Sequence, residues 1–334
     1  MRGGEVLERL AHVDLVAFDK TGTLTAGAPR LVAITLAPES DLDEDALLAL
    51  AAAVESRSEQ PLAHGIVDAA RERGLALAPV QDFEAAPGRG VCGRVSESDI
   101  ALWSPRAALE RGVDRGVLER LVAPHEERGE STVVVLRGGA LVGVLGLRDA
   151  PREGSRRAIE ALRGAGLEVA LLSGDRAAAA NSVAGELGIE QVRGGLLPEE
   201  KAAALAAWRR EGRRVLMVGD GINDAPALAA ADVGIALGGG TDIALDTSDG
   251  ALLRDEPEQV VTLLALARRT LSTIRANLVW AFGYNLVALP AAAGLLERWL
   301  GDGPSPTVAA AAMSISSLAV VLNSLRLRRA RLRL

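Results

Sequence analysis

The sequence predicts an α/β protein with a doubly wound parallel sheet, an inserted α+β domain and a C-terminal helical hairpin. Short apolar segments alternate with Ala-, Arg- and Glu-rich segments of helical length. About a hundred residues separate the first apolar segment from the next, which is too long for a loop. Near the C-terminus, two stretches of twenty residues carry no charge. Each observation accounts for one part of the prediction.

The parallel sheet follows from the order of the elements. A strand, a helix and another strand in succession form a parallel unit, and ligands bind at the C-terminal ends of such strands. The sheet domain is predicted to comprise residues 1–25 and 133–260, and the insertion residues 26–132. Strands are expected at residues 13–18, 133–136, 141–147, 168–172, 214–218 and 233–236, with helices such as 152–164 and 199–210 between them.

The two uncharged stretches, residues 277–296 and 306–325, predict a pair of transmembrane helices within a C-terminal region 261–334. Each is long enough to cross roughly 30 Å of hydrocarbon. Three arginines precede the first stretch and five lie in residues 326–334. The positive-inside rule therefore places both ends and the large body in the cytoplasm, as in a multi-pass protein of an inner or plasma membrane. A buried helical hairpin of a soluble protein is the alternative.

Composition excludes some classes of protein. The net charge is −7, and no basic patch is interleaved with aromatic residues, so a nucleic-acid partner is not expected. Cys92 is the single cysteine, which excludes an internal disulfide framework. The three histidines are too far apart in the sequence to form a metal-binding motif.

The most informative motif is DKTGTLT, Asp19–Thr25, directly after the first predicted strand. A carboxylate there can attack a phosphoryl group and carry it covalently, while backbone N–H groups of the glycine turn hold the phosphoryl oxygens. A phosphatase of this architecture would have a second aspartate two residues later to activate water. Thr21 is a poor base, so an aspartyl phosphate on Asp19 is expected to persist as an energy-coupling intermediate.

A second motif, GDGINDAPAL at residues 219–228, follows another predicted strand. Asp220 is suited to hold Mg²⁺ beside the phosphorylated carboxylate, because Mg²⁺ binds through one or two carboxylates, phosphate oxygens and waters. Asn223 and Asp224 can orient those waters. The motif lacks an intact GxGxxG, which argues against a dinucleotide site.

Two single residues complete the predicted site. Ser173 follows the strand 168–172 and can donate a hydrogen bond to a phosphoryl oxygen. Lys201 can neutralise charge in the transition state of phosphoryl transfer. Taken alone, each is explained as well by a turn or by a solvated helical lysine. Their order after successive strands favours one common site.

These motifs resemble the phosphorylation-domain motifs of P-type ATPases, which are members of the haloacid-dehalogenase-like (HAD-like) superfamily. The resemblance rests on DKTGTLT, on SGD at residues 173–175 in place of TGD, and on GDGINDAPAL. It implies that ATP is the phosphoryl donor, that Asp19 is phosphorylated, and that Asp19, Thr21 and Asp220 hold Mg²⁺. It also implies that the insertion is a nucleotide-binding domain.

Within the insertion, ESRSEQPLA at residues 55–63 looks like the ESxSEHPLA element of heavy-metal pumps. By this resemblance Glu55 and Gln60 contact the nucleotide, and Gly88 and Gly90 match a glycine loop near ATP. Gln60 replaces the family's histidine, and Pro105 stands where the family has asparagine. These departures leave a degenerate nucleotide site as an alternative.

In the hairpin, Tyr284 and Asn285 resemble a helix of copper-type pumps, and Met313 with Ser316 resembles the next helix. A thioether suits Cu(I), and polar groups within a bilayer suggest an ion pathway. The resemblance therefore implies a heavy-metal cation as cargo, with Cu(I) favoured and silver chemically equivalent. The same residues also serve as packing contacts between membrane helices.

The resemblance further implies that six membrane helices, an actuator domain and a CPC metal site lie upstream, so the chain is expected to be a C-terminal portion that does not transport metal alone. Its partners would be ATP, the metal cation, membrane lipid and the missing N-terminal part. Two other functions remain open. One is a HAD-type phosphatase, and the other is a degenerate membrane-bound nucleotide-binding protein.

Overall fold

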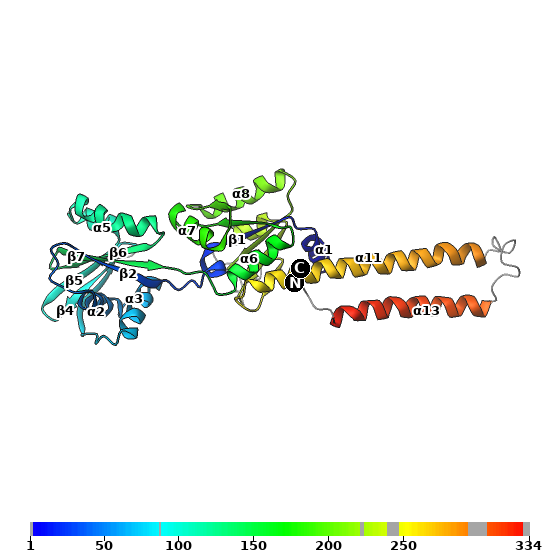
Figure 1. The fold of residues 1–334 in the computed structure, drawn as a ribbon, viewed down its shortest axis with the longest axis horizontal. Coiled ribbons are helices and arrows are strands. Elements are labelled where there is room, and N and C mark those ends of the chain that lie inside the picture. The colour runs from blue at the N-terminus through cyan, green and yellow to red at the C-terminus, as the bar shows by residue number, and fades with distance from the viewer. Residues whose placement is uncertain (1–2, 87, 221–223, 239–246, 293–305, 330–334) are drawn as a thin grey trace.

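The computed structural model describes residues 3–86, 88–220, 224–238, 247–292 and 306–329. Its central part is a parallel six-stranded sheet with the order β12-β11-β10-β1-β8-β9 (Figure 1). From β1 the sheet extends to β8 on one side and to β10 on the other. The predicted doubly wound parallel sheet is confirmed. The strands are β1 (Leu15–Asp19), β8 (Glu168–Leu172), β9 (Gln191–Arg193), β10 (Val215–Gly219), β11 (Val233–Leu237) and β12 (Gly250–Leu252).

Both faces of this sheet are covered, because alternate side chains of a strand point to opposite faces. Val16 and Phe18 of β1 lie in one apolar core, and Leu15 and Ala17 lie in the other. The first core is shared with α1 (Gly4–Ala11), α6 (Ser155–Gly164), α7 (Ala177–Leu187) and the start of α11. The second is shared with α8 (Pro198–Arg210) and α9 (Ala225–Ala230).

The insertion is an α+β domain built on a second six-stranded sheet, which is antiparallel and has the order β2-β7-β6-β5-β4-β3. Helices α2 and α3 share a core with one face of this sheet, and α4 and α5 with the other (Figure 1). Its strands are β2 (Arg30–Leu36), β3 (Val80–Ala86), β4 (Gly90–Val95), β5 (Ser98–Trp103), β6 (Ser131–Arg137) and β7 (Ala140–Arg148). Its helices are α2 (Glu44–Glu55), α3 (Pro61–Glu72), α4 (Pro105–Glu110) and α5 (Arg115–Glu127).

The strands predicted at 133–136 and 141–147 lie in this antiparallel sheet, so their assignment to the parallel sheet was wrong. Gly138 and Gly139 both have positive φ and join β6 to β7 in a hairpin. β7 then pairs with β2, the first strand of the insertion. Residues 133–148 therefore pack with the insertion rather than with the sheet domain.

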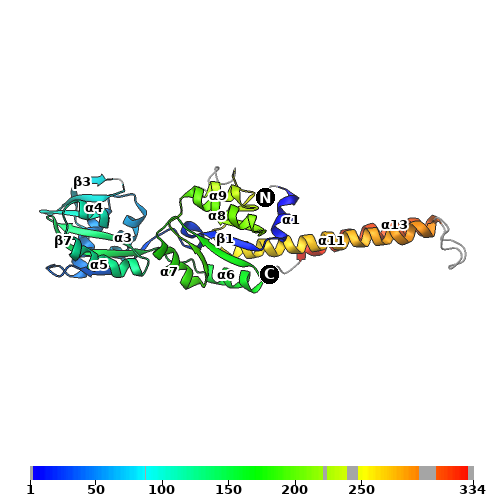
Figure 2. The same cartoon turned by 90° about the horizontal axis from the view of Figure 1, so that it is seen from above.

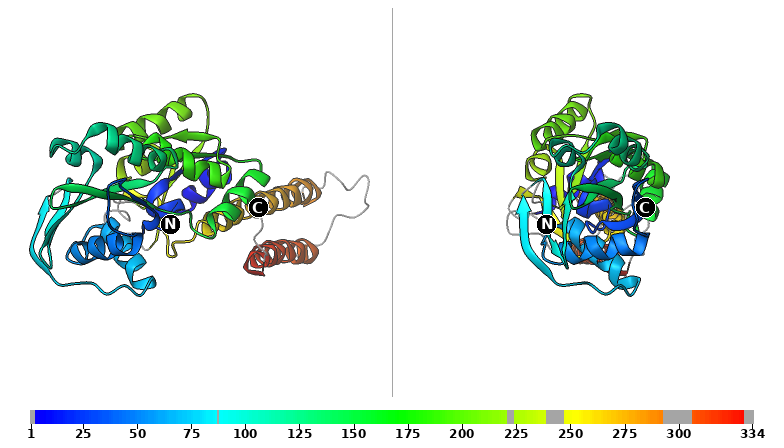
Figure 3. Two further views of the ribbon diagram at one scale, coloured as in Figure 1. Left: turned by 60° about the vertical axis from the view of Figure 1, so that its left-hand side comes forward. Right: turned by 90° about the vertical axis from the view of Figure 1, so that its left-hand side faces the viewer.

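Two long helices, α11 (Glu258–Ala292) and α13 (Pro306–Leu325), stand where the sequence predicts the hairpin, and η2 (Arg326–Arg329) follows them. They run side by side and project away from the sheet domain on the side opposite the insertion (Figures 2 and 3). Among the described residues, however, no helix has both the length and the apolar character needed to cross a membrane. The predicted crossings at 277–296 and 306–325 are thus not found, and residues 293–296 of the first lie outside the described part of the chain.

Candidate active site

Asp19 is the last residue of the central strand, at the C-terminal edge of the parallel sheet. Its partner on β8 is Leu172, so the segments after both strands emerge next to each other. The following turn, η1 (Lys20–Leu24), contains Gly22 at φ +73°, a conformation that glycine adopts at little cost. The turn closes with a hydrogen bond from the Thr25 N–H to the carbonyl of Lys20, at 3.0 Å. The chain thereby reverses around the Asp19 carboxylate.

Lys201 of α8 joins Asp19 to Asp224. Its Nζ donates hydrogen bonds to Asp19 Oδ1 at 2.5 Å and to Asp224 Oδ1 at 2.7 Å. All three side chains are buried, and each is at most 8% exposed. The two ion pairs to Lys201 fix the orientation of both carboxylates. Because the site is buried, water does not screen these interactions.

The cluster carries more negative than positive charge. Burial and the neighbouring Asp224 raise the pKa of Asp19 to about 7, although Lys201 acts to lower it. Burial likewise raises the pKa of Asp224. Burial acts to lower the pKa of Lys201, but the two carboxylates outweigh it and raise that pKa. Lys201 therefore stays charged, and Asp19 can exchange a proton near neutral pH.

Asp220 completes an acidic set that suits a divalent cation. A methyl group on Gly22 would lie 3.7 Å from the Asp220 carboxylate, which places Asp220 beside the turn after Asp19. The Oδ2 atom of Asp224 is buried, and within the described part of the chain no donor forms a hydrogen bond with it. The described residues contain no cluster of three metal-binding side chains. Mg²⁺ needs only one or two carboxylates when phosphate oxygens and waters supply the rest, so these residues fit it.

The other residues predicted for the site are placed less tightly. The Ser173 hydroxyl is buried and accepts a hydrogen bond from the Asp175 N–H at 3.1 Å. Thr21 is exposed and lines the cleft described below. Asn223 lies outside the described residues. Asp224 accepts a hydrogen bond from Lys201, and the sequence did not predict this contact.

Sequence reasoning also missed residues that brace the turn. Lys20 is buried and forms an ion pair with Asp175. The Arg152 guanidinium donates a hydrogen bond to the carbonyl of Gly22 at 2.9 Å, and the Thr25 hydroxyl donates one to Asp149 at 2.5 Å. The pair of Lys20 with Asp175 could have been inferred, because the two residues lie within three positions of the ends of adjacent strands. The others depend on where the insertion rejoins the sheet domain, which no motif marks.

A cleft of about 510 Å³ extends from this turn to the insertion. The sheet domain contributes Thr21 and Asp175 to its wall, and the insertion contributes Ser104, Pro105 and Ser131. Pro105, predicted as a departure from the family pattern, thus lies on the path between the two domains. The cleft is suited to an elongated ligand that reaches from the insertion to Asp19.

The predicted nucleotide contacts lie at the ends of helices and strands of the insertion. Glu55 ends α2, is 7% exposed, and has an Oε2 atom without a hydrogen-bond partner. Burial raises its pKa. Gln60 is exposed and precedes α3. Gly88 and Gly90 have positive φ, and a Cβ on Gly90 would lie 2.0 Å from the carbonyl oxygen of Leu102.

The predicted metal-transport residues are distributed over both long helices. Tyr284 and Asn285 lie in α11, and Met313 and Ser316 lie in α13. Asn285 is exposed and Ser316 is half-buried. The side chains of Tyr284 and Met313 lie outside the described part of the structure. A common ligand set remains a prediction.

One family profile matches the part of the chain that contains the parallel sheet from β1 to β10, Asp19 and Lys201. The family profile of the haloacid dehalogenase-like hydrolases matches residues 13–232, well over half of the chain. The chain belongs to the haloacid dehalogenase-like hydrolases. In this family member the match runs across the insertion, from β1 to the loop before β11.

The sequence of this hydrolase is homologous to copper-exporting P-type ATPases over nearly its whole length. It is 42% identical over 98% of its residues to copper-transporting ATPase 2 of Rhizobium meliloti, and 41% identical to a copper-exporting P-type ATPase of Legionella pneumophila. A probable copper-exporting P-type ATPase V of Mycobacterium tuberculosis is 43% identical. The chain spans about two-fifths of these relatives, 39%, 44% and 42% respectively.

Solved structures show the same architecture. A zinc-transporting PIB-type ATPase in the E2.Pi state matches 97% of this chain with a TM-score of 0.83 and 37% identity, and the match covers 51% of that structure. The catalytic domain of the CPx-ATPase CopB-B matches 79% of this chain, with a TM-score of 0.64 and 30% identity, and 94% of that domain is covered. The sheet domain and its insertion therefore form a unit that recurs in heavy-metal ATPases.

Proposed function

We propose that this chain transfers the terminal phosphoryl group of ATP to its own Asp19, and that this step drives heavy-metal transport in a complete pump. The observation that carries the proposal is the buried Asp19–Lys201–Asp224 cluster at the C-terminal edge of the parallel sheet. It combines a fixed carboxylate nucleophile with a cation able to neutralise a transferred phosphoryl group.

In the proposed step, an Asp19 carboxylate oxygen attacks the γ-phosphorus, the bond from that phosphorus to the bridging oxygen breaks, and ADP leaves. Lys201 remains charged throughout and stabilises the phosphoryl oxygens. The N–H groups of the turn after Asp19 are available for the same oxygens. When bound, Mg²⁺ would be held by Asp19, Thr21 and Asp220, and would supply charge neutralisation.

A phosphatase is the second candidate, and Thr21 argues against it. Rapid hydrolysis of an aspartyl phosphate needs a base close to the attacking water. The residue two positions after Asp19 is a threonine, and the nearby Asp224 is held by Lys201. The phosphoenzyme is therefore expected to accumulate in this chain rather than turn over rapidly.

The insertion is proposed to bind the nucleotide. Glu55 supports this role because the Oε2 atom of its buried carboxylate has no hydrogen-bond partner and is ready to accept a hydrogen bond from a donor on a ligand. Gln60 is exposed and free to contact the same ligand without carrying charge. The cleft past Pro105 then provides the route along which the phosphates reach Asp19.

For the transported ion we propose Cu(I), on the basis of the copper-exporting relatives and of Met313. The match to a zinc-transporting structure makes Zn²⁺ the competing choice. The chain spans about two-fifths of the length of its curated relatives. We therefore expect transport to need the segments of those relatives that lie outside the matched region. We place the complete pump in a membrane, with the sheet domain and insertion in the cytoplasm.

Labelling with γ-³²P-ATP and Mg²⁺, followed by acid quench, tests the phosphorylation step. We expect an acid-stable, hydroxylamine-labile label that disappears in Asp19→Asn. The matched control is Asp14→Asn, which removes a carboxylate from the other end of the same strand, where it pairs with Arg214.

Three results would contradict the proposal. Equal labelling of Asp19→Asn would show that another residue accepts the phosphoryl group. Fast release of phosphate from small phosphoesters, without a trapped intermediate, would favour the phosphatase. Absence of label together with weak nucleotide binding would favour a degenerate nucleotide-binding protein.

A further inference from the structure

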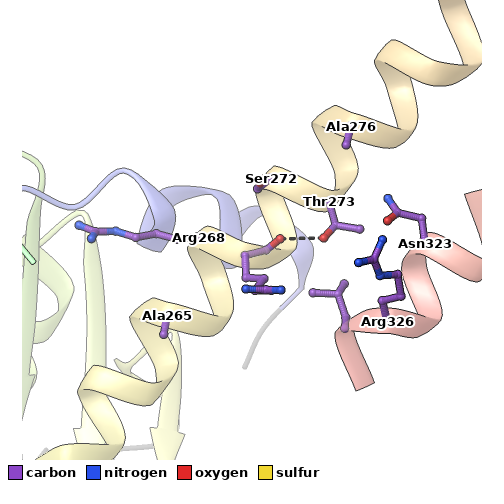
Figure 4. Close-up of a pocket in the computed structure, with 9 residues that line it drawn as sticks. Ala265, Arg268, Ser272, Thr273, Ala276, Asn323 and Arg326 are labelled. Carbon is purple, nitrogen blue, oxygen red and sulfur yellow. Dashed lines mark hydrogen bonds between the residues drawn. The ribbon is translucent and has the colours of Figure 1, made fainter. Parts of the chain in front are cut away.

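A second cavity lies far from Asp19, where the two long helices meet η2. Its volume is about 490 Å³. The wall contributed by α11 includes Arg269, Thr273 and Ala276, and the opposite wall includes Asn323, Arg326 and Leu327 (Figure 4). The candidate active site shares no residue with this cavity.

The cavity has a surplus of positive charge. Among the described residues, neither Arg269 nor Arg326 forms an ion pair with a carboxylate, and both are exposed. Figure 4 shows the guanidinium of Arg326 in the space between α11 and α13, whereas Arg268 extends to the other side of α11. The Thr273 hydroxyl donates a hydrogen bond to the carbonyl of Arg269 at 2.9 Å. The chemistry of such a space favours an anion with several acceptor oxygens.

Polar contacts between the helices hold the cavity in shape. Asn277 Nδ2 donates a hydrogen bond to Ser324 Oγ at 2.9 Å, and Asn323 Nδ2 donates one to Asn277 Oδ1 at 2.8 Å. These bonds lie next to the cavity and fix the end of α13 against α11. The backbone that carries Arg326 is therefore held in place before a ligand binds, which lowers the entropy cost of binding.

The surface next to the cavity is apolar. Val279 is 73% exposed and Trp280 is 58% exposed on α11, and Leu318 of α13 is 57% exposed. Arginines beside exposed aliphatic and aromatic side chains are suited to a membrane surface, where phosphate head groups meet acyl chains. A soluble anion would account for the arginines, but not for the apolar surface beside them.

We propose that the pocket between Arg269 and Arg326 binds the phosphate group of an anionic phospholipid. The guanidinium groups donate to the phosphate oxygens, and the neighbouring apolar side chains of α11 and α13 contact the acyl chains. The site is independent of Asp19 and of nucleotide, so it goes beyond the proposed phosphorylation.

The test compares binding of the full chain to phosphatidylcholine vesicles with and without phosphatidylglycerol. We expect Arg269→Gln/Arg326→Gln to reduce the preference for phosphatidylglycerol by about tenfold or more. The control, Arg120→Gln/Arg210→Gln, removes the same charge from exposed positions on α5 and α8 and should retain the preference. An equal loss in both variants would mean attraction by net charge, and would overturn the proposal.

A second measurement uses the unaltered chain. Phenylglyoxal modifies accessible arginines, and peptide mass spectrometry locates them. Phosphatidylglycerol vesicles should protect Arg269 and Arg326 several-fold more than phosphatidylcholine vesicles do, and leave Arg120 unchanged. Protection by inorganic phosphate alone, matched against sodium chloride at equal ionic strength, would mean a site for free phosphate and would overturn the lipid proposal. No protection by either would overturn the pocket itself.

Discussion

At the scale of single residues, the site depends on how two carboxylates share one ammonium beside a third carboxylate. Asp19 and Asp224 both contact Lys201, and Asp220 adds a third negative charge nearby. A buried carboxylate with too few positively charged partners has a raised pKa, because its neutral form avoids the cost of desolvation. The same surplus makes the site receptive to a divalent cation. Reactivity and stability at this site should therefore vary with pH in opposite ways.

At Mg²⁺ concentrations low enough to leave Asp19 without a bound cation before ATP arrives, the rate of Asp19 labelling should fall about tenfold for each pH unit below about 7, because only the ionised carboxylate attacks phosphorus. Burial and Asp224 set that midpoint by raising the pKa of Asp19 to about 7. Initial labelling rates at a series of pH values measure it, with ATP binding followed in parallel. A rate that stays flat to pH values near the ordinary carboxyl pKa would refute the assignment.

The stability of the unaltered chain should fall as the pH rises, and Asp19→Asn should remove this loss. The pKa of Asp19 is raised from 3.8 to about 7 on folding, so its contribution is complete below pH 3.8 and is lost as the pH rises through 7. Without Mg²⁺, the free energy of unfolding of Asp19→Asn relative to the unaltered chain should rise with pH between these limits. Above pH 7 the variant should be more stable by up to about 4 kcal/mol. Urea unfolding at acidic and alkaline pH measures the difference. A gain that does not depend on pH would contradict this explanation.

Removing the ammonium should be far more damaging. Lys201→Met leaves Asp19 and Asp224 without their shared partner, and should cost about 3–5 kcal/mol at alkaline pH. The cost should shrink below pH 7, where Asp19 takes up a proton. Arg210→Met, on the exposed face of the same helix, is the control for loss of charge. Equal unfolding midpoints for the two variants would rule out the buried ion pair as a stabilising contact.

At the scale of elements, local pattern predicts some features and tertiary pairing decides others. β1, β8 and α8 are predicted well because their apolar patterns are continuous and clearly bounded. β6 and β7 were misplaced, because a strand buried on both faces looks the same in a parallel and an antiparallel sheet. The Gly138-Gly139 hairpin was the available signal. Lys201 was predicted as a transition-state cation, but its bond to Asp224 depends on packing between α8 and α9.

Gly88, before β4, and Gly90, the first residue of β4, offer a paired test of element geometry. Gly90→Ala should cost at least about 3 kcal/mol, because its Cβ would meet the Leu102 backbone oxygen at 2.0 Å and its φ is +145°. Gly88→Ala has open space around it and φ +71°, so it should cost only about 1 kcal/mol. Urea unfolding of both variants measures the difference. Similar losses would mean that β4 and β5 can separate to admit the methyl group.

At the scale of the whole molecule, the insertion is held to the sheet domain by contacts that α5 and β7 make with α7 and with the residue before it. Glu126 pairs with Arg176, and Arg148 pairs with Glu186 at 2.5 Å. A Cβ on Gly129 would meet the Ala179 backbone at 2.9 Å, so the two surfaces already touch there. These contacts lie beside the cleft that leads to Asp19. They should therefore influence how often the cleft is closed.

Glu126→Gln/Glu186→Gln should favour more open arrangements of the two domains. Exposed ion pairs contribute up to about 1 kcal/mol each, so loss of both pairs should shift the balance by roughly thirtyfold at most. The change should appear as a larger radius of gyration in small-angle X-ray scattering. Glu119→Gln/Glu190→Gln removes ion pairs that lie within single domains, with Arg115 and Arg163, and should leave the radius unchanged. If both double variants scatter like the unaltered chain, backbone packing around Gly129, rather than charge, sets the position of the insertion.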